Sequence, residues 1–212
     1  HRRVSSPLKP RGRAEGGVWA YVGERGEVAY DFTERRSRDG PAEVLRGWKG
    51  HLQAAARKHY DTFYASGEIV EVACWAHARR YFFESLSSDE ARAKEMLALI
   101  GRLYALERKA AGLAEVEREL LRHEHARPTL AAIESWLAAH AGAVLPKGPL
   151  GRAIAYTHGN WRAPTRCVEA GFLAIDNNAA ERALRGVAVG RKNWLFAGSA
   201  EAGPRAAVLV TL

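Results

Sequence analysis

The sequence predicts an α/β fold in which a β-sheet is interrupted by a block of α-helices. Roughly the first eighty residues hold short alternating segments, a long middle part repeats apolar residues every 3.6 positions, and the last part returns to an apolar run and a cation-rich helix. The chain has 212 residues, of which 47% are hydrophobic, so it is long enough to bury a core. One domain with an insertion, or two small domains, would fit this length.

The first part of the chain predicts a hairpin, a helix and a buried strand. "HRRVSSPLKPRGRAEGG" is basic and broken by Gly and Pro, which predicts an irregular start and no regular element. "VWAYVG" and "EVAYDFT" alternate apolar and polar residues around "GERG", which is typical of a β-hairpin. "GPAEVLRGWKGHL" has apolar residues at helical spacing, and "EIVEVACWAHA" predicts a buried strand that runs toward a helix.

The middle of the chain predicts a helical insertion. Ser88, followed by Asp89 and Glu90, is a plausible helix start. The apolar residues that would share a buried stripe are Met96, Ile100, Leu103 and Leu106, continued by Val116, Leu120 and Leu121. We therefore expect residues 1–86 to form the first part of a core, 87–165 a helical insertion, and 166–212 the C-terminal part of the core.

The stretch "DNNAAERALRGVAVGRKNWLFAGS" predicts a short helix that begins near Asn178 and is followed by a strand-like segment. Asp176 and Asn177 are both good residues for capping the start of that helix. Its buried stripe would consist of Ala180, Leu184 and Val187.

Glu181 stands alone among cations on this helix, and two interpretations are open. Arg185 lies four residues later, so the pair could form an ion pair on a solvated helix face, which spacing alone favours. Alternatively, Glu181 is a metal-binding carboxylate, surrounded by cations that contact phosphates. Those cations would be Arg182, Arg185, Arg191 and Lys192.

Composition favours a polyanionic partner. The chain has 32 Lys and Arg against 24 Asp and Glu, a net charge of +8, and phosphate neutralisation releases counterions. No apolar run is long enough to cross a membrane, and no secretory signal is apparent, so we expect a cytoplasmic protein with no membrane partner. We expect Cys74 and Cys167 to be thiols.

Several sequence motifs resemble those of the insertion-sequence-66 family of bacterial transposases. They are "ACWAHARRYFFE", "DNNAAERALR", "VGRKNWLFAGS" and "GPRAAVL", with further likeness in "VWAYVG", "AYDFTERRS", "HLQA" and the pair Asn160 and Trp161. The resemblance covers almost the whole chain. It implies a ribonuclease-H-like mixed sheet interrupted by a helical insertion, with double-stranded DNA at transposon ends as partner. Whether the chain forms a homo-oligomer is left open.

The resemblance also implies a metal site, and here the sequence departs from the family. Two Asp and one Glu would hold Mg²⁺ or Mn²⁺ for DNA strand cleavage and transfer. Glu181 matches the Glu, but Ala55 stands where the second Asp belongs, and "HRRVSS" has no acid for the first. Asp61 lies six residues after Ala55, in what we take as the next segment, and Gly186 replaces a common proline. We therefore expect weak metal binding and no activity of this chain alone.

A second group of candidates surrounds "CWAHARR". His77, Arg79 and Arg80 could contact phosphate, as could Asn193 beside Lys192, or they could be ordinary solvated residues. Cys74 and His77 have the C-x-x-H spacing of a zinc site, with His123 and His125 as further ligands. No second ligand pair completes that set, so we disfavour zinc.

Three hypotheses follow from the sequence. The chain is an insertion-sequence-66 type transposase, a non-catalytic DNA-binding remnant of one, or a helical protein-interaction domain that uses neither metal nor DNA. Glu181 with its surrounding cations argues against the third, and Ala55 separates the first from the second. We favour a transposase by descent that is inactive as it stands.

Overall fold

The computed structural model describes residues 2–4, 17–33, 39–54 and 60–193. The chain divides into two compact units. The first, called the sheet unit, comprises His1–Val72 and Asn177–Leu212. The second, called the helical unit, comprises Ala73–Asp176. Each unit has its own hydrophobic core.

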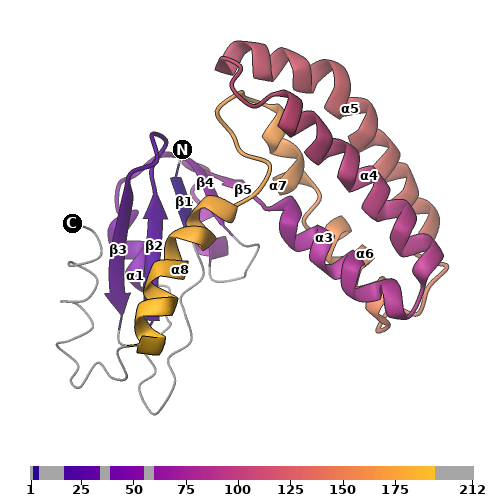
Figure 1. The fold of residues 1–212 in the computed structure, drawn as a ribbon, viewed down its shortest axis with the longest axis horizontal. Helices are drawn as coiled ribbons and strands as arrows, with labels where there is room; N and C mark the ends of the chain where they lie inside the picture. Colours follow the sequence, from indigo (N-terminus) through magenta and orange to yellow (C-terminus); the bar gives the residue numbers. More distant parts are fainter. Residues whose placement is uncertain (1, 5–16, 34–38, 55–59, 194–212) are drawn as a thin grey trace. The chain divides into compact units, whose positions relative to one another are not determined.

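The sheet unit is built on a mixed five-stranded sheet in the order β3-β2-β1-β4-β5 (Figure 1). The strands are β1 (Arg2–Val4), β2 (Gly17–Val22), β3 (Val28–Thr33), β4 (Gly50–Ala54) and β5 (Ile69–Val72). β2 is antiparallel to β1 and β3, whereas β4 is parallel to β1 and β5. Only the second strand in chain order therefore runs against the others.

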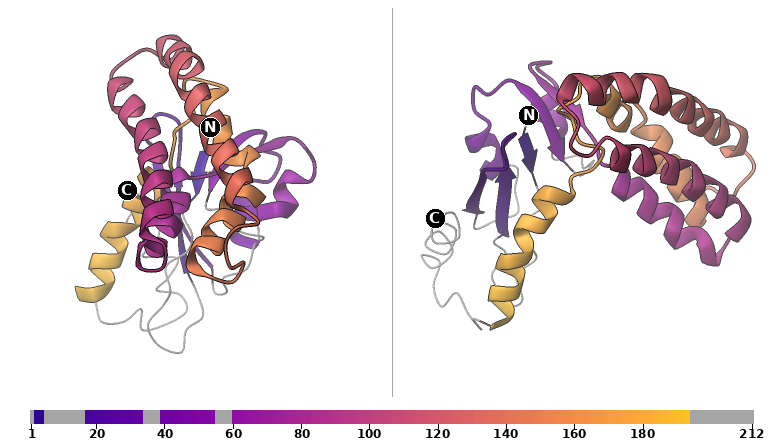
Figure 2. Two further views of the ribbon diagram at one scale, coloured as in Figure 1. Left: turned by 90° about the vertical axis from the view of Figure 1, so that its right-hand side faces the viewer. Right: turned by 45° about the horizontal axis from the view of Figure 1, so that its top comes forward.

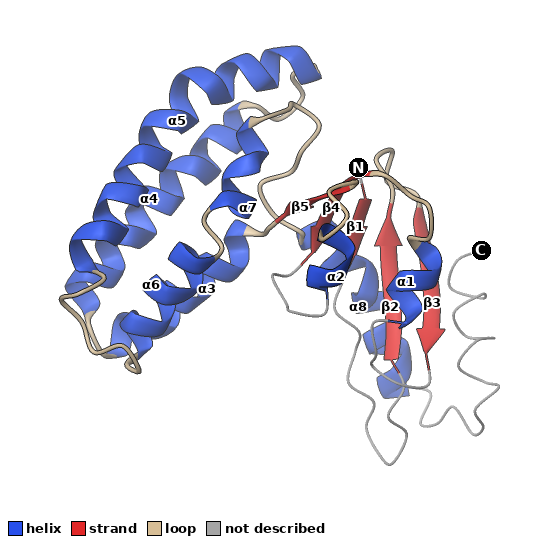
Figure 3. Cartoon of the chain, turned by 180° about the vertical axis from the view of Figure 1, so that it is seen from behind, coloured by secondary structure: helices blue, strands red, loops and turns tan. Residues whose placement is uncertain are grey.

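Helices cover both faces of this sheet (Figures 1 and 3). α1 (Asp39–Val44) and α2 (Asp61–Tyr64) lie on one face, and α8 (Asn178–Asn193) lies on the other, packed on β2 and β1. The core beneath α1 and α2 contains buried residues of the central strands, among them Val4, Trp19, Tyr21, Leu52 and Ala54. Because side chains alternate along each strand, the neighbours of these residues in the same strand point to the other face of the sheet, toward α8.

The helical unit consists of α3 (Trp75–Glu84), α4 (Glu90–Lys109), α5 (Glu115–His140), α6 (Pro149–Gly159) and the short α7 (Arg162–Thr165). The long helices α4 and α5 lie side by side (Figure 2). Asp89 caps α4, since its side chain accepts a hydrogen bond from the Arg92 amide. None of the helices in the described residues combines the length and apolar composition of a membrane span.

Several predictions about single elements are confirmed. The hairpin is β2–β3, the buried strand is β5, and it runs toward α3. The predicted helix starts are also found, at Asn178 for α8 and directly after Asp89 for α4. The predicted α/β class is confirmed as well, as a mixed sheet with helices.

Two predictions in the sheet unit are wrong. Arg2–Val4 is the central strand of the sheet, because it pairs with β2 on one edge and with β4 on the other. Val4 is fully buried, although the two other residues of the strand are arginines. The helix predicted in "GPAEVLRGWKGHL" ends at Val44. Gly47 and Gly50 have φ angles of 69° and 130°, which break the helix and let β4 begin at Gly50.

Two predictions about helices are also wrong. α8 extends to Asn193, so the predicted strand-like segment is helical up to that residue, and the rest of that segment lies outside the described residues. Val116 and Leu120 are exposed on α5, because the buried stripe of α5 runs through Arg122, Ala126, Leu130, Ile133 and Leu137. Leu121, the third residue of that predicted extension, is half-buried and packs against the core.

Candidate nucleic-acid interface

Helix α8 is fixed to the central strand at its first turn. Asn177 is fully buried, and its side-chain amide donates a 2.8 Å hydrogen bond to the Val4 carbonyl of β1. The Glu181 amide donates to the Asn177 carbonyl at 3.2 Å, so the helix begins there. Glu181 is thus one helical turn away from a residue that is bonded to β1.

The orientation of α8 about its axis follows from its buried positions. Ala180 and Leu184 are buried against the sheet. Tyr30 of β3 donates a 2.8 Å hydrogen bond to the Ala183 carbonyl, so the flank that carries Ala183 lies toward β3. With 3.6 residues per turn, Glu181 and Arg185 lie on the opposite flank.

That opposite flank lies toward the β1 side of the sheet. Asn177, Glu181 and Arg185 are spaced four residues apart and share the flank, and Asn177 is bonded to β1. Glu181, Arg182 and Arg185 are all exposed. Arg182 points away from the sheet, since it lies opposite the buried residues of α8.

The strand below presents a cation on the same face. Arg2 donates to the Val44 carbonyl of α1 at 3.4 Å and lies 5.3 Å from the centre of the Trp48 ring, on the face covered by α1. Arg3 therefore lies on the α8 face, where it is half-buried. Its neighbours in register are Val22 and the fully buried Gln53.

The remaining candidates on α8 and β4 fall at the edge of the described residues. Arg191, Lys192 and Asn193 belong to α8, but their side chains lie outside the described part. Ala55 and the side chain of Val187 also lie outside it. Asp61 is exposed at the start of α2, on the face opposite α8, so it does not join Glu181.

The candidates around "CWAHARR" belong to the helical unit. His77 is half-buried in the first turn of α3, and Arg79 and Arg80 are exposed on the same helix. The structure does not bring these three residues into the same compact unit as Glu181.

The described residues of the sheet unit do not fit a two-metal site. β1 reads "RRV" and β4 reads "GHLQA", so neither strand carries an acid on the face where Glu181 lies. Within the described ranges, no three His, Cys, Asp or Glu residues are grouped closely enough to hold a metal ion. Glu181, as a single carboxylate, cannot position two hard cations.

Both cysteines are thiols, as predicted, and both are buried. Cys74 directly precedes α3. Burial raises the pKa of the Cys167 thiol to about 12, so this thiol stays protonated at neutral pH. His123 and His125, the other residues of the disfavoured zinc set, are exposed on α5.

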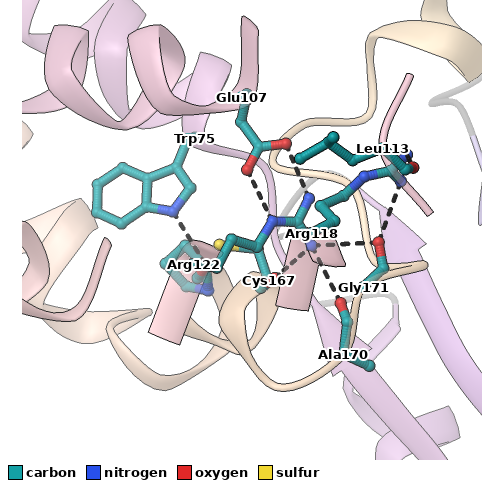
Figure 4. Close-up of polar contacts among 9 residues, drawn as sticks. Trp75, Glu107, Leu113, Arg118, Arg122, Cys167, Ala170 and Gly171 are labelled. Carbon is teal, nitrogen blue, oxygen red and sulfur yellow. Dashed lines mark hydrogen bonds and ion pairs between the residues drawn. The ribbon is translucent and has the colours of Figure 1, made fainter. Parts of the chain in front are cut away.

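A buried arginine that sequence reasoning missed organises the helical unit (Figure 4). The Arg122 side chain is 1% exposed and forms two 2.8 Å bonds with the Glu107 carboxylate. It also donates to the carbonyls of Cys167, Ala170 and Gly171, at 2.8, 3.0 and 3.4 Å. The sequence feature that could have revealed this residue is its helical spacing, since Arg122 is the first of the buried residues that continue along α5 with Ala126 and Leu130.

A second arginine, Arg118, holds the same segment. It donates to the carbonyls of Gly171 and Leu113 at 3.1 and 3.2 Å. Further along, Tyr104 of α4 donates to the Asp176 carboxylate at 3.1 Å. The segment from Cys167 to Asp176, which precedes α8 in the chain, is therefore held by both long helices of the helical unit.

Comparisons with known proteins identify the family of the chain. A family model described as "Transposase IS66 family" matches residues 6–205. No solved structure matches the chain.

Three similar proteins come from Sinorhizobium fredii (strain NBRC 101917 / NGR234), and each is described as uncharacterized. Protein y4hP is 30% identical over 233 residues, which cover 97% of this chain and 42% of the relative. Protein y4jD is 28% identical and y4qI 32% identical, each over 87% of this chain, covering 38% and 36% of the relatives. The chain thus spans about two fifths of the length of these relatives.

The family match covers more than half of the chain and includes the helix that carries Glu181. The chain therefore belongs to the insertion-sequence-66 family of transposases.

Proposed function

We propose that the chain is the ribonuclease-H-like core of an insertion-sequence-66 type transposase, and that it binds double-stranded DNA but does not cleave it alone. The topology supports the fold: five strands in the order β3-β2-β1-β4-β5, with only β2 reversed, and α8 packed on β1 and β2. The family resemblance implies a ribonuclease-H-like mixed sheet, and this topology supports that proposal. The helical unit would be the insertion into this core, between β5 and α8.

The row formed by Asn177, Glu181 and Arg185 carries the proposal. Glu181, the carboxylate that matches the family motif, lies in this row on the β1 side of α8, where the two aspartates of an active site would also be expected. In their place the described residues offer Arg3 and no acid. The retained architecture supports DNA as partner, and the missing carboxylates support the loss of cleavage.

The DNA-contacting residues would be the four cations of α8 and its last residue, an asparagine. They are Arg182, Arg185, Arg191, Lys192 and Asn193. Arg79, Arg80 and His77 of the helical unit would form a second set of phosphate contacts. Phosphate contacts from Arg and Lys are insensitive to base sequence, so transposon ends would be preferred only through residues elsewhere in a longer protein.

The salt dependence of DNA binding tests this proposal. Each phosphate that is neutralised should add about −0.9 to the slope of log K against log salt concentration. Changing Arg191 and Lys192 together to Ala should therefore flatten the slope by about two. The measurement is fluorescence anisotropy of a labelled duplex over a series of salt concentrations.

Two exposed cations of α4 provide a matched control. The double variant Arg102→Ala/Arg108→Ala removes the same charge from a helix for which no DNA contact is proposed. If both double variants flatten the slope equally, the effect reports net charge alone, and the role of Arg191 and Lys192 is refuted.

A further inference from the structure

We propose that Arg3 is part of a phosphate-binding site on the α8 face of the sheet, and that this site holds the DNA backbone without a divalent metal. The inference rests on the proposed function, because it names how the same face meets DNA. It adds a residue that lies on β1 and not on the cation-rich helix.

The position of Arg3 follows from the strand alternation on both sides of it. Val4 is fully buried in the core beneath α1 and α2, and Arg2 is bonded to the Val44 carbonyl of α1. Arg3 lies between them in sequence and must face the other way, toward α8. Gln53, its neighbour on β4, shares that face, since Leu52 and Ala54 lie in the α1–α2 core.

A second arginine, Arg185, belongs to the flank of α8 that lies toward β1, two helical turns after Asn177. Arg185 lies on the flank of α8 that continues from Asn177, and Asn177 is bonded to Val4, the residue next to Arg3. Glu181, between Asn177 and Arg185, supplies a single negative charge. The net charge of this group is positive, which favours a phosphodiester and disfavours a hard cation.

The chemistry of the guanidinium group fits this role. Arginine is always charged and presents donors in a planar fork that matches two phosphate oxygens. A metal site bridges carboxylates to phosphate, whereas an arginine contacts phosphate directly. DNA binding through Arg3 should thus persist when Mg²⁺ is removed by chelation.

The experiment compares two neighbouring arginines of the same strand. Anisotropy titrations of a labelled duplex are run with EDTA and with Mg²⁺, using the full chain and the variants Arg3→Gln and Arg2→Gln. Both variants lose one charge from β1, but only Arg3 lies on the α8 face. Circular dichroism and thermal unfolding of each variant identify any loss of folded protein before titration.

The proposal predicts that the full chain binds the duplex in EDTA at least as tightly as in Mg²⁺, because the site needs no metal and Mg²⁺ competes for the phosphates as a counterion. Arg3→Gln should weaken binding about tenfold and reduce the salt slope by about one, as expected for one lost charged contact. Arg2→Gln should leave the salt slope unchanged. If Arg3→Gln destabilises the fold, Arg3→Lys should restore stability and most of the slope, because it restores the charge.

Three outcomes would overturn the inference. Binding that requires Mg²⁺ would show that metal, and not Arg3, neutralises the phosphate, although the proposed function would survive. Equal effects of Arg2→Gln and Arg3→Gln would assign the loss to net charge. No binding in either buffer would refute both the inference and the proposed function.

Discussion

At the scale of single residues, two buried polar side chains hold backbone segments in place through hydrogen bonds. Asn177 is fully buried and joins the start of α8 to the Val4 carbonyl of β1. Arg122 is 1% exposed and joins α5 to three carbonyls between Cys167 and Gly171. Buried polar groups have this effect because leaving a partner unsatisfied costs about 1–3 kcal/mol for each group.

The Arg122 contacts predict a large loss of stability on truncation. Arg122→Met leaves Glu107 without its ion-pair partner and removes the donor from three carbonyls, so the free energy of unfolding should fall by about 3–5 kcal/mol. Urea unfolding followed by circular dichroism measures this. The double variant Arg122→Met/Glu107→Met should recover part of the loss, since it removes the unpaired charge.

An exposed ion pair on α4 serves as the control. The Nζ atom of Lys94 lies 2.6 Å from Oε1 of Glu90, and both side chains are 67% exposed. Lys94→Met should change stability little, because solvent screens such pairs. A loss for Arg122→Met as small as that for Lys94→Met would show that the buried network does not stabilise the helical unit.

At the scale of elements, the sequence was informative where a local pattern determines the structure. The hairpin, β5 and the starts of α4 and α8 were predictable, because alternation and capping residues are local signals. β1 was not predictable from its three residues, since its strand conformation depends on pairing with β2 and β4. The role proposed for Arg3 was not predictable for the same reason, whereas Glu181 stood out through its family motif.

Glycines give a paired prediction for the elements of the helical unit. A Cβ at Gly171 would overlap the backbone carbonyl of Glu115, so Gly171→Ala should destabilise the unit by about 1–3 kcal/mol. Gly101 lies within α4, and apart from its chain neighbours and the nearby backbone of its own helix, no heavy atom comes within 4 Å of a Cβ built at this position. Gly101→Ala should therefore stabilise the helix by about 0.5–1 kcal/mol.

Chemical denaturation of both variants checks this pair. The free energy of unfolding should rise for Gly101→Ala and fall for Gly171→Ala, because the alanine side chain has room at position 101 and collides with the Glu115 carbonyl at position 171. If Gly171→Ala were as stable as the parent chain, the close approach of the Gly171 segment to the first turn of α5 would be contradicted.

At the scale of the whole molecule, charge and core are divided between the two units. The sheet unit has 18 Lys and Arg against 12 Asp and Glu, whereas the helical unit has 14 against 12. Most of the net positive charge therefore belongs to the unit that contains β1 and α8. This division supports the proposal that the sheet unit would make most of the DNA contacts.

The most direct test of the account is an assay that separates DNA binding from DNA cleavage. The full chain is incubated with a labelled duplex in Mg²⁺ or Mn²⁺, and the DNA is analysed on native and on denaturing gels. The account predicts a shifted band on the native gel and intact strands on the denaturing gel, because Glu181 alone cannot position two metal ions. Metal-dependent cleavage that the variant Glu181→Gln abolishes would contradict it.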